Sequence, residues 1–357
     1  MTIVYLIDYN PHDNNGVIQK IKQQSLQWSQ KGHTVYFVST KTMSIYDHDE
    51  KVLYRQKAMH LNFGRVGTAI KLLYSAYHMK ALMGKIEFDI IYMRYRPYML
   101  FFQKVLRQHK VIMEINSDDT LEYRTHSKLK HWYNRYTREV FLKDMDAFVS
   151  VSHELKERFL YLNKPIEVIA NGIDVRSCDV AEAVDNEQPT LVFVGSPGQS
   201  WHGMEKIIKM AEYFKDYRFH IIGTEGEEMD NIRYFGYLSQ EKVIQTIKQG
   251  DVGIGTLSLY QTGLQEASPL KTRQYLACGV PLIYAYKDTD LDEKATFALR
   301  LENVEHNMDY SKIEQFVQKV FQNRDIKKAA RAFAEGVLDY AKKEERRLDF
   351  FQKVLDA

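Results

Sequence analysis

The segment 263–281 contains the residues best suited to chemistry. Ser268 followed by Pro269 predicts a helix start, with the hydroxyl as N-cap and Pro in the first turn, and a glycine further on predicts the helix end. Lys271 then lies in the first turn, where a cation disfavours the helix unless an anion binds beside it. Glu266, just before the cap, is able to accept hydrogen bonds from sugar hydroxyls. This pattern predicts a site for an anionic, phosphate-bearing sugar.

The elements that must position these residues show strand and helix alternation. Short apolar runs, each followed by a longer segment with helical spacing, are typical of parallel sheets. In the first half we expect a helix at 17–31 and strands at 3–7, 34–38, 90–93, 111–115, 147–151 and 167–169. After a polar stretch we expect strands at 190–194, 219–223, 232–235, 252–256 and 281–285, with helices at 204–214, 240–249 and 270–277.

The polar stretch 173–189 has no apolar period, and we interpret it as a linker between two doubly wound α/β domains. The first domain is expected at 1–172 and the second at 190–339. The last segment is helical almost from residue 311, and a terminal helix at about 340–357 is expected to return to the first domain.

Composition excludes several classes of protein. The chain has 357 residues with 45% hydrophobic residues and a formal net charge of +2, which favours two folded domains and argues against an obligate nucleic-acid binder. Two cysteines, Cys178 and Cys278, are too few for a disulfide framework and lack metal-ligand spacing. No apolar run approaches the roughly 18 residues of a membrane span, and residues 1–8 do not resemble an export signal. We therefore expect a cytosolic protein.

Several functions are compatible with two parallel sheets. Such sheets bind ligands at the carboxyl ends of their strands, so we expect a ligand where the two sets of ends face each other. Fold alone does not choose between a transferase, a nucleotide-sugar epimerase and a hinge-closing sugar-binding protein. A sugar-binding protein of that kind is normally exported. A phosphorylase with pyridoxal phosphate would need a Schiff-base lysine and a longer chain.

One motif resembles a known family. Glu266, seven residues, Gln274 and then the tail 275–281, Tyr-Leu-Ala-Cys-Gly-Val-Pro, resemble the donor-site signature of retaining GT-B glycosyltransferases of the family 4 type, also called glycosyl transferases group 1. That signature reads Glu-x7-Glu before an Ala-Cys-Gly-x-Pro tail. Four supporting motifs follow the family's order, at 11–16, 31–35, 170–174 and 193–195. The resemblance spans residues 1 to about 290 and implies two facing Rossmann-like domains with a C-terminal helix that returns to the first.

The resemblance also implies an activity. A sugar would move from a nucleotide diphosphate sugar to an acceptor, with retained anomeric configuration and with neither a cofactor nor an obligatory metal. The expected acceptor is a growing surface glycan or a lipid-linked glycan. Glu266 and Lys271 are the expected catalytic residues. The expected donor contacts are Gly16, Gly195, Ser196, His202, Tyr237, Ser268, Pro269, Leu270 and Gln274.

The chain departs from the family pattern in three places. The family's Arg and Lys on the diphosphate are replaced in the segment 196–203, so we expect Lys271 to supply the main charge, with hydrogen bonds from Ser196, the loop amides and His202. Gln274 replaces the second Glu of the signature. The first-domain histidine of the family has no counterpart in 114–119. On the acceptor side we therefore expect contacts from Arg94, Arg96, Asn116, Asp118 and His153.

Some of these residues have structural alternatives. Gly16 suits any strand-to-helix turn, Gln274 suits the inner face of a helix, and His153 is able to cap the helix that follows it. The turn at 171–174 is expected to be a structural hinge, and Cys278 a small buried residue.

The segment 124–143 interleaves basic and aromatic residues at helical spacing. This pattern is typical of a helix that lies on an anionic membrane, here the inner face of the plasma membrane. The alternative is a solvated helix whose aromatic side chains pack on the core.

Overall fold

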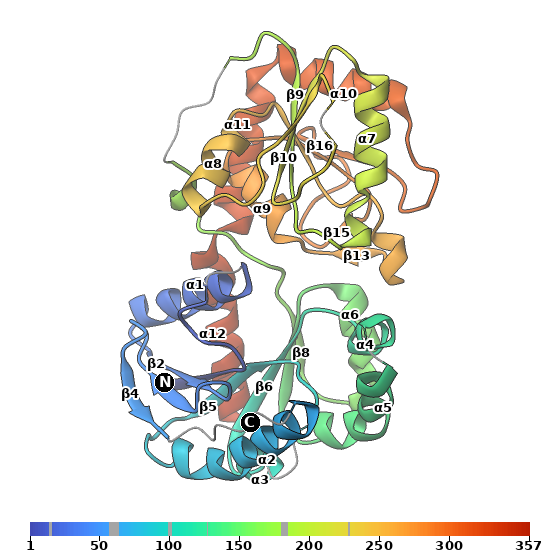
Figure 1. Cartoon of the computed structure of the whole chain (residues 1–357). Coiled ribbons are helices and arrows are strands. Elements are labelled where there is room, and N and C mark those ends of the chain that lie inside the picture. Colours follow the sequence, from blue (N-terminus) through green and yellow to red (C-terminus); the bar gives the residue numbers. More distant parts are fainter. Residues whose placement is uncertain (14–15, 57–63, 99–101, 127, 180–184, 228) are drawn as a thin grey trace. The chain divides into compact units, whose positions relative to one another are not determined.

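The computed structural model divides the chain into two compact units (Figure 1). It describes residues 1–13, 16–56, 64–98, 102–126, 128–179, 185–227 and 229–357. Unit 1 comprises Met1–Ile169 with Glu344–Ala357, and unit 2 comprises Ala170–Lys343. The division between them falls three residues before the predicted end of the first domain, and the predicted linker 173–189 is part of unit 2.

The sheet of unit 1 has the strand order β4-β3-β2-β1-β5-β6-β7-β8 among the described residues. All neighbours pair in parallel except β2 with β3 and β3 with β4, which are antiparallel. The strands predicted for this half are confirmed, whereas β3 and β4 were not expected. The bounds are β1 Thr2–Ile7, β2 Thr34–Ser39, β3 Ser44–Tyr46, β4 Val52–Arg55, β5 Ile90–Arg94, β6 Lys110–Ile115, β7 Ala147–Ser150 and β8 Ile166–Val168.

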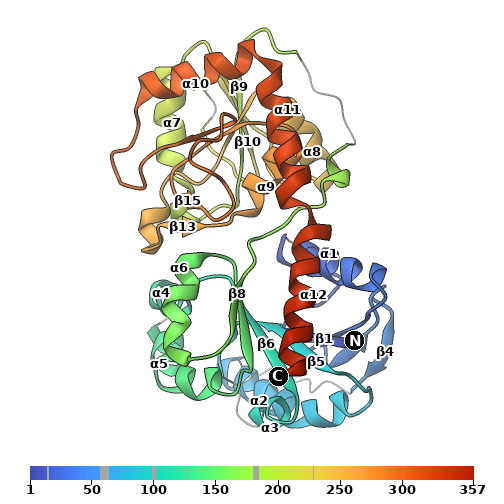
Figure 2. The same cartoon turned by 180° about the vertical axis from the view of Figure 1, so that it is seen from behind.

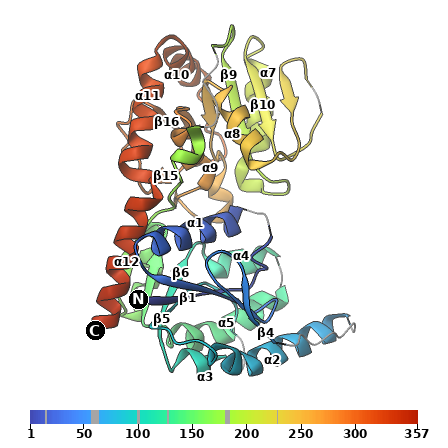
Figure 3. The ribbon, with the colours of Figure 1, turned by 90° about the vertical axis from the view of Figure 1, so that its left-hand side faces the viewer.

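Helices surround this sheet, and the last helix of the chain lies beside the first one (Figures 2 and 3). The helices with residues in unit 1 are α1 Gly16–Gln30, α2 Gly64–Met83, α3 Gln103–Leu106, α4 Asp119–His126, α5 Lys128–Leu142, α6 His153–Phe159 and α12 Tyr340–Asp356. Trp28 of α1 is completely buried and packs edge-on against Phe351 of α12, with ring centroids 5.4 Å apart. The predicted return of the terminal helix is confirmed.

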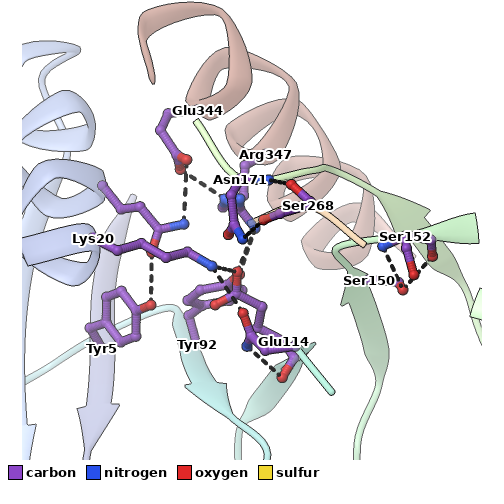
Figure 4. Close-up of polar contacts among 12 residues, drawn as sticks. Tyr5, Lys20, Tyr92, Glu114, Ser150, Ser152, Asn171, Ser268, Glu344 and Arg347 are labelled. Atoms are coloured by element: carbon purple, nitrogen blue, oxygen red, sulfur yellow. Dashed lines mark hydrogen bonds and ion pairs between the residues drawn. The ribbon is translucent and has the colours of Figure 1, made fainter. Parts of the chain in front are cut away.

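Buried polar side chains also fasten α12 to unit 1 (Figure 4). Glu344 accepts hydrogen bonds from the Trp28 indole at 2.8 Å and from Arg347 Nε at 2.8 Å. Arg347 Nη1 donates to the Tyr92 hydroxyl of β5 at 2.6 Å. Because each of these groups is buried, losing one partner would leave the other unsatisfied. The C-terminal helix is therefore an integral part of unit 1.

Unit 2 contains a second, wholly parallel sheet of order β11-β10-β9-β12-β14-β16, again among the described residues. Helices α7 and α8 lie on opposite sides of β9 and β10 (Figures 1 and 2). A separate pair of two-residue strands, β13 and β15, is also parallel. The strands are β9 Thr190–Val194, β10 Arg218–Ile222, β11 Ile232–Tyr234, β12 Val252–Ile254, β13 Glu266–Ala267, β14 Leu282–Tyr284, β15 Lys287–Asp288 and β16 Ala298–Arg300; the helices are α7 Met204–Tyr213, α8 Gln240–Lys248, α9 Leu270–Ala277, α10 Tyr310–Gln322 and α11 Arg324–Phe333.

These two units confirm the predicted pair of doubly wound α/β domains. The segment expected to be helical from 311 is divided, because a π-helical stretch at Ala334–Leu338 separates α11 from α12. No helix in the described part of the chain combines the length and apolar character needed to cross a membrane.

Candidate active site

The loop after β9 is closely packed around a glycine. Gly195 donates its N–H to Ile222 of the neighbouring strand at 3.0 Å. A Cβ atom at Gly195 would lie 2.5 Å from the Phe193 ring and 2.7 Å from His202 Nδ1. Gly223 has φ +84°, and a Cβ there would lie 2.1 Å from the Gly195 carbonyl oxygen. Only glycine fits at either position, so the backbone of this loop is held in one arrangement.

A tyrosine joins this loop to helix α9. The Tyr275 hydroxyl accepts a hydrogen bond from the Val194 N–H at 2.8 Å and donates one to the Ile254 carbonyl at 3.1 Å. Val194 immediately precedes Gly195, and Tyr275 lies one turn after Lys271. The hydroxyl therefore sets the position of the β9 loop relative to the start of α9.

Helix α9 spans Leu270–Ala277, as predicted, but the residue at its N-cap position differs from the expected one. Pro269 occupies the N-cap position, and no described side chain makes a capping hydrogen bond there. The Ser268 hydroxyl instead accepts the N–H of Asn171 at 2.8 Å, while Asn171 Nδ2 donates to the Ser268 carbonyl at 2.6 Å (Figure 4). The expectation that Ser268 is the N-cap was wrong, because a partner 97 residues away in sequence binds its hydroxyl.

Two basic residues of α9 have opposite surroundings. Arg273 is completely buried and is paired with Asp288, to which Nη2 donates at 2.8 Å, and with Asp290 at 2.9 Å. The Lys271 ammonium is also buried but has no hydrogen-bond partner among the described residues. Its Nζ lies 4.2 Å from the centroid of the Phe193 ring. Such a cation–π contact compensates only part of what an ammonium loses on leaving water. Among the described residues, Lys271 therefore lacks a group that would compensate its charge.

The charge states around Lys271 follow from this burial. Burial lowers the pKa of Lys271 to about 7. Burial also lowers the pKa of His202 to about 3, and the neighbouring Lys271 charge adds to the effect. His202 is therefore neutral at pH 7, and its ring is able to exchange hydrogen bonds without adding positive charge. An anion beside Lys271 would favour the ammonium and raise the pKa of Lys271 again.

Glu266 is buried at the start of β13, with 3% of its surface exposed. It pairs with Lys287 of β15 across the short sheet, and Lys287 Nζ lies 4.0 Å from Glu266 Oε2. Gln274, one turn after the start of α9, is buried as well. Both motif residues belong to unit 2. Glu266 precedes α9, and Gln274 lies within α9, one turn after its start.

The other expected donor residues lie further apart. Ser196 contacts His202 through its backbone, so the structure brings Gly195, Ser196, His202 and Lys271 together around Phe193. Tyr237, in the loop after β11, is 77% exposed. Gly16 begins α1 in unit 1 and is exposed, so its contact with a donor stays a prediction.

The residues expected on the acceptor side all lie in unit 1. Asn116 accepts a hydrogen bond from Lys20 Nζ at 3.0 Å, and Asp118 accepts the N–H of Leu121 and pairs with Arg158. His153 begins α6, but its predecessor Ser152 is the cap, so the alternative in which His153 caps that helix was wrong. Arg94 ends β5, and Arg96 follows two residues later.

Sequence analysis placed three of the residues that shape the site in motifs or turns, but it did not predict their contacts. Phe193 lies under Lys271, Tyr275 bridges α9 to β9, and Asn171 binds the residue before the α9 N-cap. The place of Tyr275 in the motif tail was the only signal for its role. Lys206 of α7 differs from Lys271, because its ammonium donates to the Leu257 and Val304 carbonyls and to Asn307.

The described ranges contain no cluster of metal ligands, since no group of three or more His, Cys, Asp or Glu side chains in them is arranged to hold a metal ion.

Comparison with known proteins found one family model and several solved structures that resemble this chain. Residues 15–177, nearly all of them in unit 1, match the family model of Glycosyltransferase Family 4. Sucrose-phosphate synthase from Thermosynechococcus elongatus has a similar structure, with a TM-score of 0.73 at 14% identity over 100% of both chains. The whole chain therefore has the GT-B fold, and residues 15–177 are similar to Glycosyltransferase Family 4.

Further solved structures share this fold. The catalytic domain of starch synthase IV from Arabidopsis thaliana, bound to ADP and acarbose, has a TM-score of 0.72 at 11% identity over 99% of both chains. Anabaena HepE in complex with UDP-glucose has a TM-score of 0.65 at 12% identity, over 99% of this chain and 100% of its own. A search of curated proteins found no match.

Proposed function

We propose that this glycosyltransferase is a retaining, metal-independent enzyme. It moves a sugar from a nucleotide diphosphate sugar to a glycan or lipid-linked acceptor in surface polysaccharide biosynthesis. The observation that carries the proposal is Lys271, whose buried ammonium lies in the first turn of a helix without a hydrogen-bond partner in the described part of the chain. A diphosphate is the kind of ligand that suits such a position.

The diphosphate gains negative charge as its bond to the sugar breaks, and an enzyme without a metal must stabilise that charge with its own groups. In this proposal Lys271 supplies the cation, and the first N–H groups of α9 together with the Gly195–Ser196 backbone supply hydrogen bonds. Neutral His202 adds a further hydrogen bond. The lysine pKa of about 7 without a ligand means that donor binding draws in a proton above pH 7.

Glu266 has the position and chemistry to hold the sugar. Its carboxylate is buried two residues before Ser268, and a carboxylate is a strong acceptor for two hydroxyl groups at once. Gln274 holds the ribose through its amide oxygen in this assignment. Pro269, Leu270 and Tyr237 complete the donor contacts, with Tyr237 beside the base.

The proposed reaction retains the anomeric configuration. The acceptor hydroxyl forms its bond to the anomeric carbon on the face from which the diphosphate departs. The carbon–oxygen bond to the β-phosphate breaks, its electron pair stays on the phosphate oxygen, and that oxygen takes the proton of the acceptor hydroxyl. Lys271 and the helix N–H groups stabilise the leaving diphosphate throughout. This path requires no carboxylate nucleophile.

Two related structures support a nucleotide donor. The HepE structure is a complex with UDP-glucose, and the starch synthase structure contains bound ADP. A donor panel for this chain should therefore include both bases. The base itself is left to that measurement.

An exposed surface on α5 supports a membrane-bound acceptor. We call it the α5 surface and define it by the residues Leu129, Trp132 and Tyr136. Their exposed fractions are 73%, 59% and 64%. Lys128, Arg135 and Lys143 on the same helix region are exposed as well. The alternative in which the aromatic side chains pack on the core fits Phe141 but not Trp132 or Tyr136. Basic and aromatic side chains together suit the anionic cytoplasmic face of a membrane.

The test is slow turnover of nucleotide sugars without an acceptor. We expect one UDP- or ADP-linked sugar of a panel to release free nucleotide diphosphate, and the Lys271→Met and Glu266→Gln variants to lose that release at least a hundredfold. Lys209→Met, an exposed lysine of α7 in the same unit, is the matched control. An epimerase would change the sugar without releasing nucleotide, and a binding protein would leave the panel intact. Either result would refute the proposal.

A further inference from the structure

A small recess in unit 1 is lined on one side by two arginines. Arg94 and Arg96 lie at the carboxyl end of β5, and Asp8 and Tyr9 at the end of the adjacent strand β1 line the same recess. Strands β1 and β5 are parallel neighbours, so both sets of side chains come from the edge of the sheet where α/β proteins bind ligands.

Arg94 has unused hydrogen-bonding capacity. Its Nη1 is buried and has no hydrogen-bond partner within the described ranges. The residue opposite it on β6 is Glu114, whose Oε1 is held by Lys20 Nζ at 2.5 Å and by Arg347 at 3.8 Å, whereas its Oε2 has no hydrogen-bond partner within the described ranges. A guanidinium carries its charge at every pH of interest, so burial does not simply neutralise it. Arg94 therefore has an N–H group that is able to donate a hydrogen bond to a ligand.

Arg96 adds a second, more deeply buried guanidinium to the recess. Only 8% of its surface is exposed, and its two terminal nitrogens donate to the Thr40 hydroxyl at 3.2 and 3.3 Å. Its guanidinium lies 5.8 Å from the centroid of the Phe102 ring. Asp8, the carboxylate among the described residues of the lining, is exposed to solvent. Water screens its charge, so it offsets only part of the charge of two guanidinium groups.

From this arrangement we propose that the recess binds an anionic group of the acceptor, a phosphoryl or carboxylate group, through Arg94 and Arg96. The planar fork of N–H donors on a guanidinium matches the oxygen atoms of either anion. Asp8 and Tyr9, which follow the adjacent strand β1, are placed to hydrogen-bond hydroxyls of the same molecule. The acceptor is then an acidic sugar or a sugar phosphate rather than a neutral glycan. This inference rests on the proposed function, because it names the acceptor of the same enzyme.

Binding of small probes tests the recess without any transfer reaction. Glucose 6-phosphate, glucuronate and glucose are titrated against the full chain by NMR or calorimetry. We expect glucose 6-phosphate or glucuronate to bind at least tenfold more tightly than glucose, and the Arg94→Gln and Arg96→Gln variants to remove that difference. Arg107→Gln, at an exposed arginine of the same unit, should keep it. Arg96→Lys, which keeps a charge but not the fork, checks that loss of binding does not come from misfolding.

The transfer assay then separates this inference from the proposed function. Donor turnover without acceptor tests the proposed function alone. With acceptor present, we expect anionic acceptors to have KM values at least tenfold lower than their neutral parents, and both glutamine variants to remove this preference. Tighter binding of the phosphate identifies a phosphoryl acceptor, and tighter binding of glucuronate an acidic sugar. Equal binding of charged and neutral probes to the wild-type protein would overturn the inference even if donor turnover is normal.

Discussion

Replacing Lys271 by methionine should abolish donor turnover and yet stabilise the ligand-free protein. Methionine keeps the stem of the side chain and removes a buried ammonium that has no hydrogen-bond partner among the residues described. Most substitutions at buried positions destabilise, so a gain in stability is a demanding expectation. It follows only if Lys271 is held in place for a ligand.

The magnitude follows from the pKa of the lysine. Burial lowers this pKa from 10.5 to about 7. Because a tenfold change in proton affinity is worth ~1.4 kcal/mol, the charged form costs the folded protein on the order of 5 kcal/mol below pH 7. Methionine gives up the contact with Phe193, worth about 1–2 kcal/mol. We expect a net gain of about 3–4 kcal/mol, which for a unit of this size raises Tm by roughly 6–16 °C.

The pH dependence has a definite sign. The folded protein binds this proton more weakly than the unfolded chain, so the cost is complete below pH 7 and fades as the pH rises from 7 to 10.5. The difference in Tm between Lys271→Met and the wild type should therefore be large at pH 6 and smaller at pH 9. Affinity for UDP or ADP should fall as pH rises above 7, because binding then requires proton uptake.

Calorimetry measures both effects. Differential scanning experiments at pH 6 and pH 9 compare the wild type, Lys271→Met and the exposed control Lys209→Met, and titrations with UDP and ADP follow at the same pH values. We expect Lys209→Met to match the wild type throughout. A Lys271→Met protein that is less stable than the wild type at both pH values and still binds the nucleotide would refute the reasoning.

Three further predictions concern the loop, the core of unit 1 and the α5 surface. Gly198 has φ +74° and no described atom near its Cβ position, so Gly198→Ala should lower the free energy of unfolding by about 1 kcal/mol. Gly223→Ala should lower it by a further ~1–3 kcal/mol, because its Cβ would meet the Gly195 oxygen. Chemical denaturation measures both losses, and equal losses would contradict this packing. Burial raises the pKa of Glu114, but the charges of Lys20 and Arg347 outweigh burial and lower that pKa to about 2. The stability that Glu114 contributes is therefore present above its ordinary pKa and fades as the pH falls toward 2. Glu114→Gln should therefore lose about 3–5 kcal/mol at pH 7 and the surface control Glu167→Gln less than 1 kcal/mol; similar losses in urea titrations would count against the buried ion pair. A Trp132→Ser, Tyr136→Ser double variant should sediment with anionic phospholipid vesicles at least tenfold less than the wild type, unlike Tyr54→Ser on β4, and undiminished sedimentation would exclude the α5 surface as the membrane contact.

Sequence patterns sufficed for most elements because each buried strand is a short apolar run and each helix has a polar face. The hairpin β3 and β4 was missed because all four residues of β4 are exposed and carry no period of buried positions. Helix α9 was placed correctly at both ends, since a proline before it and Gly279 at φ +71° after it are local signals.

The candidate site was predictable only in part, because its decisive features depend on contacts that are distant in sequence. The role of Ser268 changed because Asn171 binds it. Arg273, two residues after Lys271, forms ion pairs with both Asp288 and Asp290. The sequence does not show that these carboxylates pair with Arg273 and not with Lys271. Residue types at the right spacing indicated an anion site, but they did not show which of the two cations, Lys271 or Arg273, lacks a carboxylate partner among the described residues.

A structure of the protein with a bound nucleotide diphosphate tests the central claim most directly. We expect a phosphate oxygen within hydrogen-bonding distance of Lys271 Nζ, with the diphosphate at the first turn of α9 and the Gly195–Ser196 backbone, and with the sugar side of the diphosphate toward Glu266. A nucleotide whose diphosphate lies elsewhere on the chain, with the Lys271 ammonium buried and untouched by it, would contradict the account.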